Sequence, residues 1–151
     1  MSRWSRGEAE IDQMLKNGHL QHVTGAAANG GPWLARASTT ITTAERIAST
    51  DAASAYTLAY DAARFACVGL LAQQGLRPTT DGGHYAVQRA VLGQFGARFD
   101  VLSTMRRRRN EIEYPDFADE TIETDEANEA VRNARSVIEA AFKLVDHLDL
   151  Y

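Results

Sequence analysis

The segment from Ala52 to Gln74 constrains the fold more than any other part of the sequence. Its alanine, leucine and aromatic residues crowd on more than one face of a helix, so that neighbouring elements must surround it. Thr50 or Asp51 is suited to cap the beginning of this helix. Gly75 is suited to end it, and Pro78 prevents its resumption. The segment therefore predicts the central helix of a bundle.

The remaining segments also predict helices, from the spacing of apolar residues and from start and stop signals. The β-branched run Thr39–Thr43 favours a strand locally, but no second strand is legible for it to pair with. We therefore expect an all-α fold, a single antiparallel bundle of four to five main helices. One domain would span residues 1–151, with 1–7 as a loose N-terminal tail. The further helices are expected at Glu8–Lys16, Trp33–Ser49, His84–Phe95, from Ala97 to near Tyr114, and at Glu126–Leu148 after a cap formed by Thr124 with Asp125.

Composition places the chain among globular domains. It has 151 residues, of which 44% are hydrophobic and 24% are charged, which is enough to bury a core. The longest apolar run, Phe65–Ala72, is far shorter than the roughly 20 residues that cross a membrane. No leader pattern is visible, and the single cysteine, Cys67, is expected to be a small core hydrophobe. We therefore expect a cytoplasmic protein without a membrane partner.

Charge is strongly segregated, although the net charge is only −4. The four residues Arg106, Arg107, Arg108 and Arg109 are consecutive, and no Lys or Arg follows until Arg132. Between them lie only acidic charges, at Glu111, Glu113, Asp116, Asp119, Glu120, Glu123, Asp125, Glu126 and Glu129. The overall charge argues against a uniformly basic nucleic-acid-binding face, so binding of a polyanion would have to be local.

The arginine run has two interpretations. Successive residues of a helix advance by about 100°, so the four guanidinium groups cannot all share one face, and at least one must point to the core or to a partner. In the first interpretation the run is a salt-bridged helix end, with Arg107 paired to Glu111 and Arg109 to Glu113 at i, i+4 spacing. In the second it binds phosphate, because the guanidinium fork grips phosphate in two places and Asn110 adds a neutral donor.

The sequence around this run resembles a known family. The segment Arg109-Asn110-Glu111-Ile112-Glu113-Tyr114-Pro115 is similar to the R-N-x-x-E-Y-P signature of a small actinobacterial branch of the HEPN domain family, found in bacterial toxin and defence proteins. The Gly83-His84 opening of the preceding helix also fits the family pattern. The resemblance covers Glu8–Leu148 and implies a HEPN-like helical bundle. It further implies a homodimer with sites at the two-fold interface that cleave RNA without a metal ion.

One part of the family pattern is missing. HEPN ribonucleases carry an Arg followed by a polar residue and then a His on the same helix, and Tyr114 stands where that His would be. Imidazole transfers protons near neutrality because its pKa is about 6.5, whereas a tyrosine, with a pKa of about 10, is a poor base. The resemblance thus assigns Arg109 and Asn110 to catalysis and leaves Glu113 or Tyr114 to supply proton transfer. Neighbouring arginines would keep Glu113 ionised and weaken it as a base.

Other candidate residues carry weaker signals. His19 and His22 are spaced as two ligands on one helical face, but no third ligand accompanies them, and we expect no metal and no cofactor. His84 is most simply a capping or packing residue at a helix start. It becomes the alternative catalytic histidine if the fold brings it beside Arg109.

Two functions therefore follow from the sequence. The first is a HEPN-type component of a toxin–antitoxin or phage-defence system that binds RNA or a nucleotide through Arg106–Arg109 and Asn110, with metal-independent ribonuclease activity. Its expected partners are a second copy of the chain and an antitoxin protein. The second is a catalytically inactive helical dimer that acts as a scaffold or interaction module, with its arginines in salt bridges.

Overall fold

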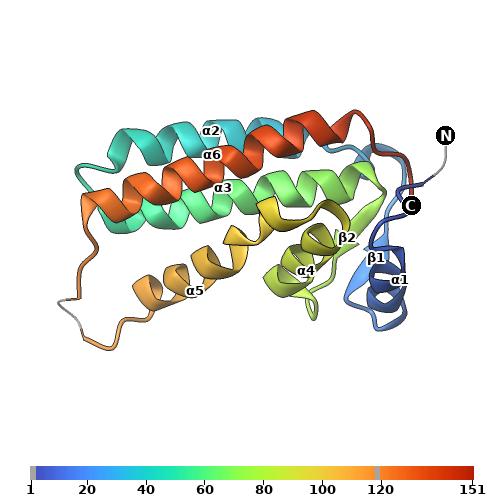
Figure 1. Ribbon diagram of the computed structural model, residues 1–151, viewed down its shortest axis with the longest axis horizontal. Helices are drawn as coiled ribbons and strands as arrows, with labels where there is room; N and C mark the ends of the chain where they lie inside the picture. The colour runs from blue at the N-terminus through green and yellow to red at the C-terminus, as the bar shows by residue number, and fades with distance from the viewer. Residues whose placement is uncertain (1–2, 118–119) are drawn as a thin grey trace.

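The computed structural model describes residues 3–117 and 120–151, and it is predominantly helical, as the sequence predicts (Figure 1). Within these residues it contains six α-helices, two short 3-10 helices (η1 and η2) and one two-stranded ribbon. In chain order the elements are α1 (Glu8–Lys16), β1 (Leu20–His22), η1 (Gly25–Ala27), α2 (Gly31–Ile47), α3 (Ala52–Gln73), β2 (Leu76–Pro78), α4 (Gly83–Phe95), η2 (Ala97–Phe99), α5 (Val101–Glu113) and α6 (Thr124–Val145).

Helix α3 is the centre of the bundle, which confirms the prediction from its all-round apolarity. Fourteen of its 22 residues are buried, and α2, α4, α5 and α6 all pack against it. Asp51 caps its first turn by accepting a hydrogen bond from the backbone N–H of Ser54 (3.0 Å). Gly75 follows its end with a φ of 72°, a left-handed conformation that glycine adopts without strain. None of the described helices is both long and apolar enough to cross a lipid bilayer.

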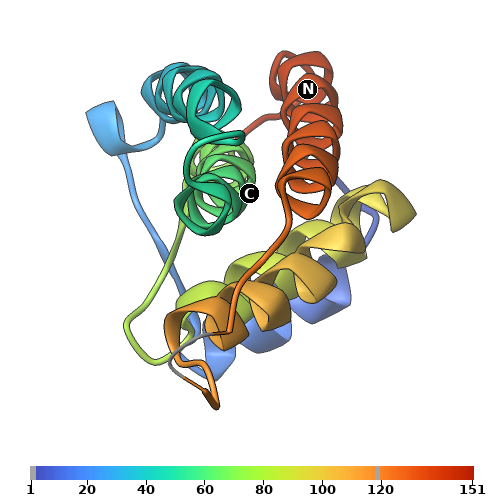
Figure 2. The same ribbon diagram turned by 90° about the vertical axis from the view of Figure 1, so that its left-hand side faces the viewer.

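The helices form two layers. Helices α2, α3 and α6 lie alongside one another, and α4 and α5 lie across the lower side of α3 (Figures 1 and 2). Helix α2 runs opposite to α3, and α5 returns in the direction opposite to both α3 and α6, which run the same way (Figure 1). The arginine-bearing helix α5 packs against α3, and its side chains also reach α4 and α6.

The ribbon is a feature that the sequence did not predict, and the expectation of no strand was wrong at this point. Strands β1 and β2 pair antiparallel, with Leu20 opposite Pro78 and His22 opposite Leu76. Each strand has three residues, and their partners are distant in the sequence. Such short strands show no alternating pattern, so local periodicity could not reveal them. Their pairing ties the chain before α2 to the loop before α4.

Two helix boundaries also differ from expectation. The helix expected from Ala97 begins instead at Val101, because Gly96 adopts a φ of 91° and residues 97–99 form η2. The expected cap by Thr124 with Asp125 is wrong as well, because both residues lie inside the helix. Helix α6 begins at Thr124 itself, and its N-cap residue, Glu123, makes no side-chain capping hydrogen bond.

The N-terminal residues from 3 onward are not a loose tail, and residues 1–2 lie outside the described part. The indole N–H of Trp4 donates to the backbone oxygen of Gln94 (3.0 Å), and its ring packs edge-on against Phe95 at 5.3 Å. The hydroxyl of Tyr151 donates to the backbone oxygen of Glu8 (2.9 Å), which holds the C-terminal end against α1. Aromatic burial and these hydrogen bonds anchor both ends on the bundle.

A buried amide pair fixes α4 against α3. Gln74 and Gln94 are fully buried, and each side chain donates to the other, at 2.6 and 3.0 Å. Buried polar groups that satisfy each other in this way specify one arrangement, since any displacement leaves an amide unpaired. The pair therefore sets how α4 lies beside α3, and with it the position of the residues at the start of α4.

Candidate functional site

The four consecutive arginines of α5 are divided among different sides of the helix. The 100° step between residues turns Arg108 toward α6, while Arg106 and Arg109 face the side of α3 and α4. Arg107 is exposed, and no carboxylate within the described residues forms an ion pair with it. The run is therefore not one cationic surface, and its members have different chemical surroundings.

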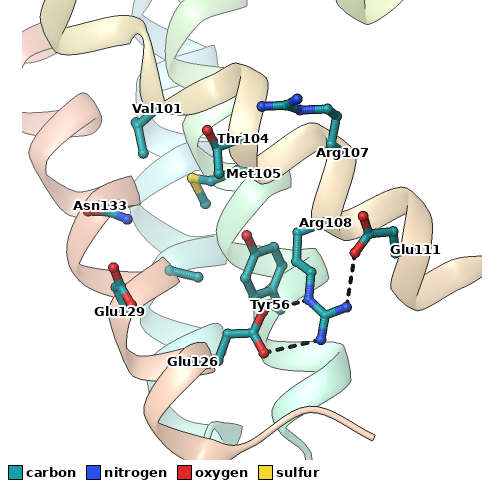
Figure 3. A pocket seen from close by; sticks show the side chains of 11 residues that line it. Tyr56, Val101, Thr104, Met105, Arg107, Arg108, Glu111, Glu126, Glu129 and Asn133 are labelled. Atoms are coloured by element: carbon teal, nitrogen blue, oxygen red, sulfur yellow. Dashed lines mark hydrogen bonds and ion pairs between the residues drawn. The ribbon is translucent and has the colours of Figure 1, made fainter. Parts of the chain in front are cut away.

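Arg108 is held between two carboxylates (Figure 3). Its Nε and Nη2 donate to the two carboxylate oxygens of Glu126 on α6, at 2.5 and 3.2 Å. Its Nη1 donates to Glu111, one turn along α5, at 3.1 Å. These hydrogen bonds raise the pKa of Arg108 above its ordinary value. Each of its three side-chain nitrogens therefore already donates to a carboxylate of the protein.

The same ion pairs line a pocket of about 380 Å³ between α5 and α6 (Figure 3). Tyr56 of α3 forms part of its wall, and burial together with the nearby charge of Glu126 raises the pKa of Tyr56 to about 12. The pairing that the sequence predicted between Arg107 and Glu111 is wrong, because Glu111 bonds to Arg108 instead. On this side of α5 the first interpretation, a salt-bridged helix, describes the geometry.

The opposite side of α5 holds a group that we call the histidine–arginine cluster, formed by Arg64 of α3, His84 of α4, and Arg106 and Arg109 of α5. Arg109 makes the predicted i, i+4 ion pair with Glu113, and its side chain is 22% exposed. Arg106 donates from Nε to the side-chain oxygen of Gln88 at 3.1 Å. The cluster joins three helices and contains three guanidinium groups.

Two donors in the cluster are not satisfied by the protein. The Nε atoms of Arg64 and of Arg109 are buried and have no hydrogen-bond partner among the described residues. A buried N–H without an acceptor is costly, and such groups are rare unless a ligand or a function accounts for them. Arg108 differs from them, because its Nε, like its other two side-chain nitrogens, donates to a carboxylate.

His84 is oriented by a hydrogen bond to the core. Its Nδ1 lies 3.2 Å from the hydroxyl of Tyr60 on α3, and burial raises the pKa of that hydroxyl to about 12, so Tyr60 stays protonated. Partial burial, followed by the charges of Arg64 and Arg109, lowers the pKa of His84, and Asp61 opposes the shift. The imidazole is therefore neutral at pH 7, with Nε2 left for another partner.

The other residues singled out in the sequence lie at the edge of this cluster. Asn110 follows Arg109 on α5, is exposed, and makes no side-chain hydrogen bond within the described residues. Glu113 is engaged by Arg109. Tyr114 lies just beyond the last turn of α5, with 75% of its surface exposed. The charge of Arg109 acts on the imidazole of His84, so the two residues lie near each other, which is the arrangement under which the sequence favoured His84 as the alternative catalytic histidine.

The sequence pattern did not single out Arg64, Asp61 or Tyr60 as site residues. A signal for them exists, because Asp61 and Arg64 are the only charged residues within α3. A charge inside an otherwise apolar helix must reach the surface or a partner. Both lie within one turn of Tyr60, and this spacing marks the face of α3 that meets His84.

The weaker candidates do not form sites. His22 lies in β1 and His19 directly before it, so the two histidines do not share a helical face as their spacing suggested. Within residues 3–117 and 120–151, no group of three or more His, Cys, Asp or Glu side chains is placed to hold a metal ion. Cys67 is fully buried in α3, and burial raises the pKa of its thiol.

Comparison with known proteins gives one match. A family model described as HEPN domain matches residues 32–145, from the start of α2 to the end of α6. No curated protein and no solved structure matches the chain. The matched span includes all four members of the histidine–arginine cluster.

Proposed function

The chain belongs to the HEPN domain family, and on that premise we propose that it binds RNA through the histidine–arginine cluster and cleaves it without a metal ion. The observation that carries the proposal is that the guanidinium groups of Arg64, Arg106 and Arg109 lie near enough to His84 for their charges to lower its pKa, while the buried Nε atoms of Arg64 and Arg109 have no hydrogen-bond partner among the described residues. Guanidinium groups bind phosphate and stabilise the charge that develops on it, and a neutral imidazole accepts a proton. RNA cleavage requires both.

In this proposal His84 takes the role that the missing histidine of α5 would have had. With its proton on Nδ1, directed at the hydroxyl of Tyr60, the ring leaves Nε2 free to accept the proton of a ribose 2′-hydroxyl. The 2′-oxygen then forms a bond to the adjacent phosphorus as the bond to the 5′-oxygen breaks. The products are a 2′,3′-cyclic phosphate and, after protonation of the leaving oxygen, a 5′-hydroxyl end.

The arginines of α5 have separate roles. Arg109 and Arg106 bind the phosphate and stabilise its charge, with Asn110 as an additional donor at the exposed edge. Glu113 restrains Arg109 through their ion pair and is a weaker candidate for proton transfer than His84, because an adjacent guanidinium favours the ionised carboxylate. Tyr114 is a proton-transfer candidate only if it reaches the phosphate from beyond the end of α5.

We extend the proposal to the biological setting and the partners that the family suggests. The chain would act in a toxin–antitoxin or phage-defence system, as a homodimer and with an antitoxin protein. The exposed aromatic side chains of Tyr114 and Phe117, at 75% and 71%, support an interface near the end of α5, since large apolar groups at the surface favour contact with a partner.

A second candidate function rests on Arg108. Its bonds to Glu126 and Glu111 show that part of the arginine run stabilises the bundle. If the whole run served that purpose, the protein would be a non-catalytic helical scaffold or interaction module. The histidine–arginine cluster favours the first function, because its positive charges outnumber the carboxylates that face them.

Total RNA incubated with the protein in EDTA tests the proposal. Wild type should cleave RNA, and Arg109→Ala should lose both cleavage and tight binding, because a phosphate contact and its charge stabilisation are gone. Arg135→Ala is the matched control, since Arg135 is a partly buried arginine of α6 that pairs with Glu45. A wild-type protein that neither binds nor cleaves RNA would leave the scaffold function in its place.

A further inference from the structure

An exposed aromatic ring stands directly beside the histidine–arginine cluster. Tyr85 follows His84 in the first turn of α4, and 56% of its surface is exposed. A single exposed aromatic residue is common on protein surfaces and by itself needs no explanation. Tyr85 differs from an isolated surface residue because it lies within reach of one of the proposed phosphate-binding groups.

That group is Arg106. Its guanidinium carbon lies 6.0 Å from the centre of the Tyr85 ring, and its Nε donates to Gln88, one turn further along α4. Within residues 3–117 and 120–151 no carboxylate forms an ion pair with Arg106. The tyrosine ring and Gln88 thus hold an uncompensated positive charge at the surface of α4, and most of the ring remains accessible.

The second cation near the ring is in a different state. Arg89, one turn after Tyr85 on the exposed face of α4, is paired with Glu10 of α1. Of these two cations, only Arg106 is without an ion pair within the described residues. The uncompensated charge near Tyr85 is therefore that of a member of the histidine–arginine cluster. A ligand that uses both the ring and the free charge needs a flat apolar group and an anionic group within the span of one nucleotide.

We propose that Tyr85 is the stacking platform for a nucleobase whose phosphate contacts Arg106. This inference rests on the proposed function and assigns a base-binding residue to its site. Base stacking on an aromatic side chain, combined with a cationic contact to the backbone, is how single strands are held without base-specific readout. A base inside a duplex is stacked on its neighbours and cannot lie on the ring. His84, adjacent in the sequence, then lies beside the same nucleotide.

Binding is measured with three probes that separate the ring from the charge. The first is a short single-stranded RNA carrying 2′-O-methyl groups, which has no 2′-hydroxyl to attack the phosphate and is not cleaved. The second is the same strand annealed to its complement. The third is inorganic polyphosphate, which offers anionic groups but no bases.

We expect Tyr85→Leu to weaken binding of the single strand about tenfold and to leave polyphosphate binding unchanged. Tyr85→Phe should bind the single strand as wild type does, because the ring is retained. Phe142→Leu is the matched control, since Phe142 is an aromatic residue of α6 that is 46% exposed. The wild-type protein should bind the single strand more tightly than the duplex.

Three results would overturn the inference and leave the proposed function standing. The first is that Tyr85→Leu binds the single strand as tightly as wild type does. The second is that Tyr85→Leu loses as much affinity for polyphosphate as for the single strand. The third is that the wild-type protein binds duplex and single strand with equal affinity. If Arg106→Ala and Arg109→Ala bind all probes as wild type does, or if wild type binds none, the proposed function itself fails, and this inference fails with it.

Discussion

The two sides of α5 carry arginines from the same run in opposite chemical states. Toward α6, Arg108 has its donors directed at two carboxylates, from Glu126 and Glu111. Toward α3 and α4, Arg106 and Arg109 share their surroundings with Arg64 and a neutral imidazole. One side of the helix is compensated, and the other has an excess of positive charge that an anion could neutralise.

Adjacent residues of a charge run therefore need not share a function. A helix separates adjacent side chains by about 100°, so a run of four residues covers a full turn and meets several environments. The state of each arginine is decided by the helix that faces it. Here α6 presents glutamates to α5, and α3 and α4 present a tyrosine, a histidine and another arginine.

Removing the imidazole of His84 should have the largest effect on the cationic side of α5. We expect His84→Ala to slow RNA cleavage about 100-fold or more, because a general base contributes at least that factor, while RNA binding stays near wild type. Single-turnover cleavage and a binding titration measure the two quantities. His147→Ala, an exposed histidine near the end of α6, should cleave as wild type does. Unchanged cleavage by His84→Ala would return proton transfer to Glu113 or Tyr114.

The compensated side is tested by Arg108→Ala. Loss of the hydrogen bonds to Glu126 and Glu111 should lower the free energy of unfolding by about 1–2 kcal/mol, with RNA binding retained. Urea denaturation measures the free energy of unfolding, and a binding titration measures the affinity for RNA. Arg107→Ala, without an ion pair among the described residues, should change stability by less than about 0.5 kcal/mol. If Arg108→Ala is as stable as wild type but no longer binds RNA, Arg108 is a binding residue, and the two sides of α5 have the same function.

The ion pair between Arg109 and Glu113 offers a smaller test. Glu113→Gln removes the carboxylate that competes with phosphate for Arg109, and we expect RNA to bind about two- to fivefold more tightly at low salt. Titrations at two salt concentrations check this, because the gain should shrink as salt screens the charge. If this variant loses cleavage instead, Glu113 supplies the proton transfer that the sequence assigned to it.

The smallest expected effect is on the pH dependence of stability. The folded-state pKa of His84 is lowered below its unfolded value of about 6.5, so the unfolded chain binds more protons between the two values. Stability should therefore be full above about pH 6.5 and decrease as the pH falls through that window. Urea denaturation of wild type and His84→Gln at pH values on either side of the window isolates the contribution. Equal pH dependence in both proteins would mean that neither burial nor the nearby arginines lower the pKa of His84 in the folded protein.

The features that the sequence predicted well are local ones. The central helix, its cap at Asp51 and the pairing of Arg109 with Glu113 all depend on residues within one turn of each other or on the apolar pattern of one segment. Such interactions are readable because helix geometry fixes which neighbours meet.

The features that the sequence did not predict are contacts between distant segments. Arg108 bonds to Glu126 on another helix, although Glu111 and Glu113 are nearer in the sequence. His84 on α4 bonds to Tyr60 on α3, a contact between two helices that no local pattern encodes. Packing of the whole core determines how the helices lie against one another. That packing in turn determines which side chains meet in the histidine–arginine cluster.

The β1–β2 ribbon has a consequence for anyone who trims the chain. The HEPN match begins at residue 32, after β1, yet Leu20–His22 supply the only strand that pairs with Leu76–Pro78 within the described residues. A fragment cut at the family boundary would expose the backbone edge of β2 and leave the loop leading into α4 without its anchor. In such a fragment, limited proteolysis should cut first near the start of α4. The cooperative folding unit is therefore longer than the span by which the family is recognised.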